Sequence, residues 1–277
     1  MTATLPTTIA AAASLAPGPS LGADLRLVAH QVRAEQRSFW RNRSRAAFSI
    51  AFPLVFLVVF CAMNGNDRIE ALGNITFATW FVPGILAYGL IMATFSNVAI
   101  STCIARDSGL LKRLRGTPLP AWAFFVGRIA STLLVASALV VATLALGIVA
   151  YGVTLRTSTL PALLVTLLVG SACFTALGLA ITGFIPNADA APAIVNLIVL
   201  PLTFISGIWV VMADAPTWLQ HVAEAFPVRA LAHGLQHAFD PATAGPGFDG
   251  KDLAILAAWT VVGVVVALRR FRWAPAR

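Results

Sequence analysis

The 277-residue sequence contains few charged residues, which make up 11% of the chain, whereas soluble domains carry roughly 25%. Hydrophobic residues account for 58% of it. So little charge is atypical of a chain folded against water on all sides, so the composition excludes an ordinary soluble domain. It predicts a membrane protein.

Lysine and cysteine are also scarce. The only lysines are Lys112 and Lys251, and neither lies in a glycine-rich loop of the kind that binds nucleotide phosphates. The serines and cysteines lack an oriented base nearby in sequence, so we predict no catalytic residue and no enzyme activity. The three cysteines have no metal-type or pairable spacing, and we expect free thiols at Cys61, Cys103 and Cys173.

Long charge-free windows dominate the sequence. A helix needs about 20 apolar residues to cross a bilayer, and no window alternates with the period of two that a membrane barrel requires. Since backbone groups in lipid must be satisfied within the segment, the windows predict an all-α membrane protein with six transmembrane helices. The predicted spans are 46–63, 78–100, 128–152, 160–184, 190–211 and 252–268, within a membrane domain of residues 46–268.

The basic residues lie mainly on one side of these spans. Fifteen of the nineteen fall in the N-terminal flank, around the loop after span two, or in the tail 269–277. Basic flanks stay in the cytoplasm, so we expect a multi-pass bacterial plasma-membrane protein with both termini cytoplasmic. This topology also accounts for the net charge of +8, so we predict no nucleic-acid partner.

No Asp, Glu, Lys, Arg or His is expected well inside a span, and Arg128 and Arg156 are expected to snorkel from span ends. Ion-coupled carriers usually bury such groups. A proton-coupled secondary transporter is therefore kept only as an alternative function, from a different class of transporter.

Residues 1–20 lack a signal-peptide pattern and predict a disordered tail. Residues 21–45 predict an amphipathic interfacial helix, with Leu25, Val28, Val32 and Phe39 or Trp40 on one face. Its arginines face the headgroups of the lipid bilayer. A topology anchor and a gating or partner-docking role fit this helix equally well.

The block 106–120 is compact and charged. Leu110, Leu111 and Leu114 are predicted to share one face of a helix of two or three turns, which Pro118 ends. An ordinary positive-inside loop is the alternative interpretation.

The loop between spans five and six predicts an exterior helical hairpin. One apolar stripe runs through Trp218, Leu219, Val222 and Phe226, and a second helix follows Pro227. The two helices either cap an exit path or simply pack at the interface. His233 and His237 stand four residues apart without the glutamate of the zinc-protease motif, so no metal site is predicted.

Proline, glycine and asparagine residues interrupt the predicted spans. They are candidates for a translocation path, although ordinary helix packing explains each singly. These path candidates are Pro83, Gly84, Asn97 and Asn196.

The order of these elements, with 106–120, Ser206-Gly-Ile-Trp209, Pro216-Thr-Trp-Leu219 and Phe226-Pro227, resembles permeases of the type-two ABC exporter family over residues 25–272. It is most similar to the daunorubicin-resistance-like branch. The resemblance implies a six-helix permease whose coupling helix, between spans two and three, docks on a cytoplasmic ABC ATPase. That ATPase would bind ATP and Mg²⁺, and a second permease, identical or related, would complete a dimer.

Carried over by position, the coupling element consists of Arg106, Asp107, Gly109, Leu110, Leu111, Arg113, Leu114 and Pro118. The family often has Glu near the position of Asp107, which puts that contact in doubt. The exterior gate candidates are Ser206, Gly207, Trp209, Pro216, Trp218, Leu219, Phe226 and Pro227. The implied activity is export of an apolar or amphipathic compound such as a drug, antibiotic or lipid. Export of a polysaccharide or glycolipid by the same family remains open.

Overall fold

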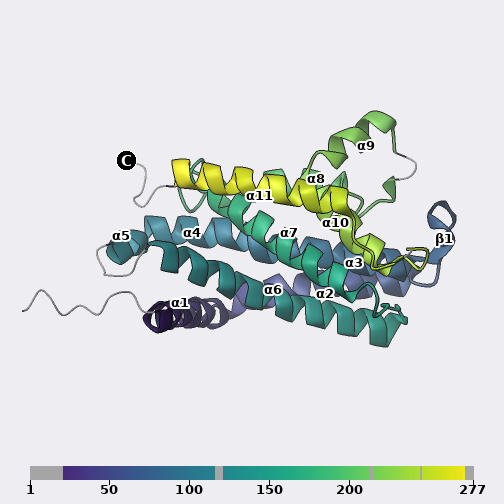
Figure 1. Cartoon of the computed structure of the whole chain (residues 1–277), viewed down its shortest axis with the longest axis horizontal. Helices are drawn as coiled ribbons and strands as arrows, with labels where there is room; N and C mark the ends of the chain where they lie inside the picture. The colour runs from purple at the N-terminus through teal and green to yellow at the C-terminus, as the bar shows by residue number, and fades with distance from the viewer. Residues whose placement is uncertain (1–20, 116–120, 213–214, 244, 272–277) are drawn as a thin grey trace, which may run out of the picture.

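The computed structural model describes residues 21–115, 121–212, 215–243 and 245–271 as a bundle of long helices (Figure 1). The short helix α5 (Leu110–Arg115) lies at one end of the bundle and strand β1 (Arg68–Ile69) at the other. We name these the α5 end and the β1 end. The predicted tail 1–20 and Pro118 lie outside the described residues, as does the end of the tail beyond Phe271.

Within the described residues, four helices are long and apolar enough to cross a membrane: Phe77–Asp107, Val126–Tyr151, Leu160–Ile181 and Gly250–Arg270. They coincide with the second, third, fourth and sixth predicted spans. Two shorter apolar helices, Ser49–Asn64 and Ala191–Phe204, occupy the first and fifth. The helical membrane fold is therefore confirmed, while the six-span topology stays a prediction.

The second span is one continuous helical rod made of three segments. Its helix α3 (Phe77–Ile91) passes through the π-helical turn η4 (Met92–Ser96) into α4 (Asn97–Asp107). Phe81, Ile85, Leu86 and Leu90 are completely buried, so α3 forms the centre of the core. Helices α2 (Arg43–Asn64), α6 (Ala121–Tyr151) and α7 (Leu160–Ile181) pack on α3. Helix α8 (Ala191–Phe204) packs on η4 and α4, and α11 (Gly250–Arg270) packs on α7.

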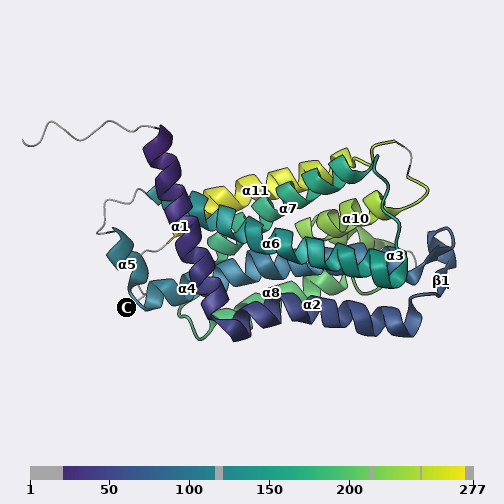
Figure 2. The ribbon, with the colours of Figure 1, turned by 90° about the horizontal axis from the view of Figure 1, so that it is seen from below.

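Helix α1 (Leu21–Arg41) crosses the long axis of the bundle at the α5 end (Figure 2). Its packed face differs from the predicted stripe, because Leu25 is 66% and Trp40 51% exposed. Phe39 is buried, and so is Gln31 about two turns earlier in the helix. The helix therefore packs on α6 partly through polar side chains, which hydrophobic periodicity does not detect.

A small hairpin covers the β1 end. Strands β1 and β2 (Ile75–Thr76) pair antiparallel, with Arg68 opposite Thr76, and the short helix η3 (Glu70–Leu72) connects them. The hydroxyl oxygen of Thr76 then accepts a hydrogen bond from the backbone N–H of Thr79 and caps α3.

Two helices, α9 (Thr217–Glu224) and α10 (Pro227–Phe239), occupy the predicted hairpin between spans five and six. Helix α10 is inserted into the bundle rather than lying on its surface, because Ala230, Leu231, Gly234 and Leu235 are buried. The small residues on this helix allow α3, α7 and α11 to approach it closely. Helix α9 keeps Trp218 exposed.

Candidate functional site

Arg106 is buried at the α5 end, with 2% of its surface exposed. Its guanidinium donates hydrogen bonds to the carbonyl oxygens of Thr182 at 3.0 Å, Ile185 at 3.0 Å and Pro186 at 3.1 Å. These carbonyls end α7 and begin the connection to α8, where a cation offsets the negative end of the helix dipole. Arg106, a predicted coupling residue, holds this connection, and its coupling role stays a prediction.

Asp107 completes the same contact. Its Oδ1 pairs with Arg106 Nε at 3.0 Å, and its Oδ2 accepts a hydrogen bond from the backbone N–H of Ala188 at 2.6 Å. The end of α4 is thereby joined to the 182–190 segment. A displacement at the α5 end thus has a hydrogen-bonded route to α8.

Helix α5 follows a sharp turn at Gly109, whose φ of 73° lies in the left-handed region that glycine tolerates. Leu111 is completely buried, whereas Leu110 is 49% exposed and Lys112 and Arg113 are also exposed. The prediction that the leucines share one face is thus wrong for Leu110 and Leu111, because Leu111 packs into this chain. The helix as described is also shorter than predicted, and the Leu114 side chain and Pro118 lie outside the described residues.

At the β1 end, a tight turn at Gly207 is held by α10. Arg229 Nη1 donates to the carbonyl oxygen of Ser206 at 3.0 Å, and Gln236 Nε2 donates to that of Gly207 at 3.0 Å. Gly207 has φ 84°, and a Cβ there would lie 2.3 Å from Arg229 Nη1.

Trp209 lies within an aromatic cluster that joins three helices, α2, α3 and α8. Its ring centroid is 5.3 Å from that of Phe56, 5.1 Å from Tyr88, 6.2 Å from Phe81 and 6.3 Å from Phe204. Of the other gate candidates, Phe226 stacks on Trp259 and Pro227 begins α10, while Pro216 is exposed. Leu219 is half-buried on α9, next to exposed Trp218. The predicted gate is therefore divided between a packed segment and the exposed helix α9.

A polar cavity of about 390 Å³ opens at this end. Helices α3, α9 and α10, the Gly207–Met212 segment and the β1 hairpin enclose it. Its charged and polar lining includes Glu224, Arg229, His233, Gln236, His237 and Asp240. Such a cavity suits a hydrated or polar group more than an apolar one.

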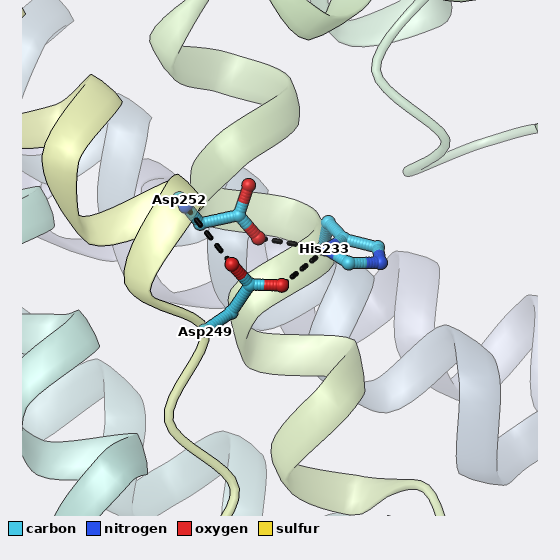
Figure 3. Close-up of side chains that lie close together, drawn as sticks. All are labelled: His233, Asp249 and Asp252. Carbon is cyan, nitrogen blue, oxygen red and sulfur yellow. Dashed lines mark hydrogen bonds and ion pairs between the residues drawn. The ribbon is translucent and has the colours of Figure 1, made fainter.

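His233 lies between two carboxylates at the start of α11 (Figure 3). Its Nδ1 donates to Asp252 Oδ2 at 2.7 Å and lies 3.7 Å from Asp249 Oδ2, while Asp249 Oδ1 caps the helix. These ligand atoms lie within 4.8 Å of one another, which is compatible with a divalent cation. The direct hydrogen bond already pairs His233 with Asp252, and this pair ties α10 to α11. Sequence spacing paired His233 with His237 instead; His237 Nδ1 lies 3.3 Å from the Gly247 carbonyl oxygen.

The predicted path residues are not brought together. Gly84 packs against the Ile208 backbone, where a Cβ would lie 3.2 Å from the carbonyl oxygen, and Pro83 beside it is buried. Asn97 lines a cavity at the α5 end, and Asn196 is exposed on α8. A separate apolar cavity of about 320 Å³ lies between α7, α8, α10 and α11, lined by residues such as Phe174, Leu177, Leu202 and Trp259.

Sequence reasoning missed one buried ion pair. Helix α6 begins at Ala121, so Arg128 lies inside it, 5% exposed, with Nη1 3.3 Å from Glu35 Oε1 on α1. The expectation that Arg128 snorkels is therefore wrong. Arg156 is exposed and donates to the Thr243 carbonyl oxygen at 3.1 Å.

Apolar helices of membrane length, packed around the central α3, define a multi-helix membrane protein with a short helix at one end. Its residues 27–239 match the family model described as ABC-2 type transporter. The chain belongs to this family, and is thus an ABC transporter permease by class.

Two bacterial relatives have related sequences. The chain is 26% identical over 156 residues to "Probable multidrug ABC transporter permease YbhR" of Escherichia coli K12, which covers 56% of this chain and 42% of YbhR. It is 22% identical over 190 residues to "Inner membrane transport permease YadH" of the same organism, covering 68% of this chain and 73% of YadH. The chain therefore spans less than half the length of YbhR. The daunorubicin-resistance-like branch stays a prediction.

Proposed function

We propose that this chain is the transmembrane subunit of an ATP-driven exporter that moves an apolar or amphipathic compound out across the bacterial plasma membrane. Membership of the ABC-2 family, which implies an ATPase partner, supports this proposal. The multidrug description of YbhR and the apolar cavity beside α8 support the class of cargo. ATP and Mg²⁺ bind to the partner in this account, and the permease itself is not catalytic.

The observation that carries the proposal is the division of α5 into a buried and an exposed side. Leu111 anchors the helix to this chain, while Leu110, Lys112 and Arg113 remain available at the tip of the bundle. Apolar and basic groups side by side suit a protein partner with a complementary acidic rim. We assign ATPase docking to this exposed side.

Arg106 and Asp107 act behind that surface in our account. Because both bind the 182–190 segment, a push on α5 would reach α8 through hydrogen bonds rather than through a flexible loop. These two residues are therefore proposed as positioning residues for α8. The Glu common in the family near Asp107 has a longer side chain, which would hold the Ala188 amide at a different distance.

The orientation rests on charge. Arg33, Arg37, Arg269 and Arg270 lie toward the α5 end, which we therefore assign to the cytoplasm together with both termini. We assign α2 and α8 as the first and fifth of six membrane segments. The 14 residues of α8 extend about 21 Å, less than the hydrocarbon thickness of about 30 Å, so the Gly207 segment and α10 would complete the crossing.

The outer faces of α2 and α8 suit a second permease. Val55, Val58 and Phe60 on α2 and Leu197 and Leu200 on α8 are exposed. Apolar faces of this kind contact either lipid or another helix surface. We propose a permease dimer, identical or related, in which cargo leaves through the β1 end past Gly207 and Trp209.

Purification from native membranes tests this function directly. We expect the chain to bring down an ATPase, and membrane vesicles containing both to accumulate an amphipathic dye only when ATP is added. A chain that purifies alone and drives the same uptake from a proton gradient without ATP would instead be a secondary transporter.

A further inference from the structure

The apolar cavity beside α8 runs lengthwise between α7, α8, α10 and α11. Every described residue that lines it is apolar, and the indole N–H of Trp259 already donates to the Ala225 carbonyl oxygen at 2.9 Å. Water would therefore find no free polar side chain inside, so the cavity stays dry. A space of about 320 Å³ without atoms deprives the side chains around it of dispersion contacts, which a hydrocarbon chain would restore.

The apolar cavity occupies the half of the bundle nearer the α5 end. On α11 its lining extends from Trp259 to Val266, about 10 Å along the helix axis. Arg270 lies about one turn further toward the α5 end, so about 17 Å separate it from Trp259 along the helix. This length is close to half of the hydrocarbon thickness of about 30 Å. The cavity therefore matches the apolar chain of an amphiphile that lies in one leaflet.

Arg270 is positioned at the α5 end of the apolar cavity. Its guanidinium carbon lies 5.9 Å from the ring centroid of Phe184, which lines the cavity. Its backbone is closely packed, because a Cβ on Gly183 would lie 2.7 Å from the Arg270 carbonyl oxygen. The Arg270 side chain is exposed, and no carboxylate pairs with it in the described part of the chain. Such a guanidinium can bind two oxygens of a phosphate, sulfate or carboxylate group.

The other end of the apolar cavity touches the helix that holds the Gly207 turn. Phe226 and Val228 line the cavity at the start of α10. The next residue, Arg229, donates to the Ser206 carbonyl oxygen at 3.0 Å. A chain that fills the cavity thus contacts α10 directly, and a displacement of α10 would reach a segment that contains gate candidates. This connection favours the cargo over a resident lipid as the occupant.

We propose that the apolar cavity binds the transported compound, a single-chain amphiphile whose anionic head meets Arg270. One chain suits a cavity near the lower limit of the roughly 300–1,000 Å³ typical of ligand pockets, whereas a phospholipid would leave its second chain outside. Because Arg270 lies at the α5 end, the compound enters from the leaflet at that end. The inference rests on the proposed exporter function, to which it adds the charge of the cargo and its side of entry.

The binding test uses the full chain in phosphatidylcholine nanodiscs without an ATPase. The probe is dodecyl phosphate that carries a photoreactive diazirine at the end of its chain. We expect saturable labelling around Phe226 and Trp259, which mass spectrometry locates. Unlabelled dodecyl phosphate should displace the probe about tenfold better than dodecyltrimethylammonium or dodecyl glucoside, which share its chain length.

Arg270→Gln removes the cation, so it should weaken dodecyl phosphate binding about tenfold and abolish the preference among the three heads. Arg269→Gln is the matched control, because it removes the same charge about 100° away around the helix and should retain wild-type binding. If Arg270→Gln does not fold, the head preference of the unchanged protein decides the question. Equal effects of the two variants, or equal displacement by the three heads, would overturn the proposal.

A second pair of variants tests the place of the chain. Val262→Trp fills the apolar cavity from α11, while Val261→Trp adds the same side chain at the neighbouring position outside it. The two valines are 47% and 63% exposed, so both variants should fold. We expect the photolabelling to be lost in Val262→Trp and unchanged in Val261→Trp. Equal labelling of the two variants would show that the chain binds elsewhere, which contradicts the proposal.

Transport distinguishes cargo from a resident lipid. In membrane vesicles that contain the ATPase, ATP should drive uptake of radiolabelled dodecyl phosphate, and Val262→Trp should block this uptake. Binding without ATP-driven uptake, or a phospholipid that co-purifies in stoichiometric amount and blocks the label, would overturn the assignment as cargo. If ATP drives uptake of the amphipathic dye while dodecyl phosphate neither binds nor accumulates, this inference fails and the exporter function stands.

Discussion

The carboxylate of Asp107 accepts a 2.6 Å hydrogen bond from the backbone N–H of Ala188, and so links the end of α4 to the segment before α8. The same carboxylate orients Arg106, whose guanidinium binds three carbonyl oxygens of that segment. Two residues that family resemblance assigns to coupling thus bind within this chain, with Arg106 buried and Asp107 partly exposed. We therefore assign the partner contact to α5, the helix that follows Asp107.

Replacing Asp107 with Ala should uncouple ATP hydrolysis from transport. The change removes the Ala188 hydrogen bond and leaves Arg106 without its carboxylate, and bonds to charged groups contribute about 1.5–3 kcal/mol each. We expect a lower transport rate per ATP hydrolysed, measured in reconstituted vesicles, together with a lower unfolding temperature. Ser108→Ala, at the exposed neighbouring position, should retain wild-type coupling. Equal coupling in both variants would contradict this role for Asp107.

The two adjacent leucines of α5 should respond differently to truncation. Leu111 is completely buried, so Leu111→Ala should lower the free energy of unfolding by about 2–5 kcal/mol. Leu110 is 49% exposed, so Leu110→Ala should leave stability nearly unchanged and reduce the amount of ATPase that co-purifies. Thermal unfolding of the two variants measures the stability effect, and pull-down of the ATPase by the same variants measures the binding effect. A stable Leu111→Ala protein that loses its ATPase would reverse the assignment of the two residues.

Close packing of α7 against η4 depends on Gly178. A Cβ at this position would lie 2.8 Å from the backbone oxygen of Phe95. Because this contact is with the backbone, no flexible side chain can move aside to relieve it. Gly178→Ala should cost about 1–3 kcal/mol of stability. Gly250→Ala is the control, because a Cβ there meets nothing within 4 Å, and its unfolding temperature should match the wild type. Equal unfolding temperatures for both variants would contradict the close packing of α7 against η4 at Gly178.

The His233–Asp252 pair should hold α10 against α11. Asp252 is 7% exposed and accepts the 2.7 Å bond from His233, so Asp252→Ala should destabilise the protein by about 1–3 kcal/mol. Glu224→Ala breaks the exposed pair with Lys251 and should have a smaller effect, because water screens it. Hydrogen exchange at α10 measures the difference. Greater exchange in the Glu224 variant than in the Asp252 variant would contradict this ranking.

Much of the helical framework follows from hydropathy alone. Phe77–Asp107 and Gly250–Arg270 lie where long charge-free windows occur, and Pro227 begins α10 because proline is favoured at the first turn of a helix. Local sequence suffices for these elements, since their backbone hydrogen bonds are internal. The same holds for the glycine turn at Gly109.

The contacts within the candidate sites could not be predicted in this way. Arg106 binds carbonyl oxygens 76 to 80 residues away, and Arg128 pairs with Glu35 across 93 residues. Only the folded bundle brings these groups together. A positive-inside count treats Arg106 and Arg128 as exposed flanking charges, yet tertiary packing buries both. The burial of the polar side chain of Gln31 between α1 and α6 could not be predicted either, because it also depends on how the helices pack.

Site-specific cross-linking from α5 tests the central claim most directly. Lys112→Cys presents an exposed thiol at the tip of the bundle, while the native cysteines are buried, so a photoreactive maleimide should label this position selectively. Val149→Cys, 86% exposed near the opposite end of α6, is the matched control. In native membranes we predict a covalent adduct with an ATPase from Lys112→Cys and none from Val149→Cys. An ATPase adduct from Val149→Cys alone, or from neither position, would contradict docking at α5.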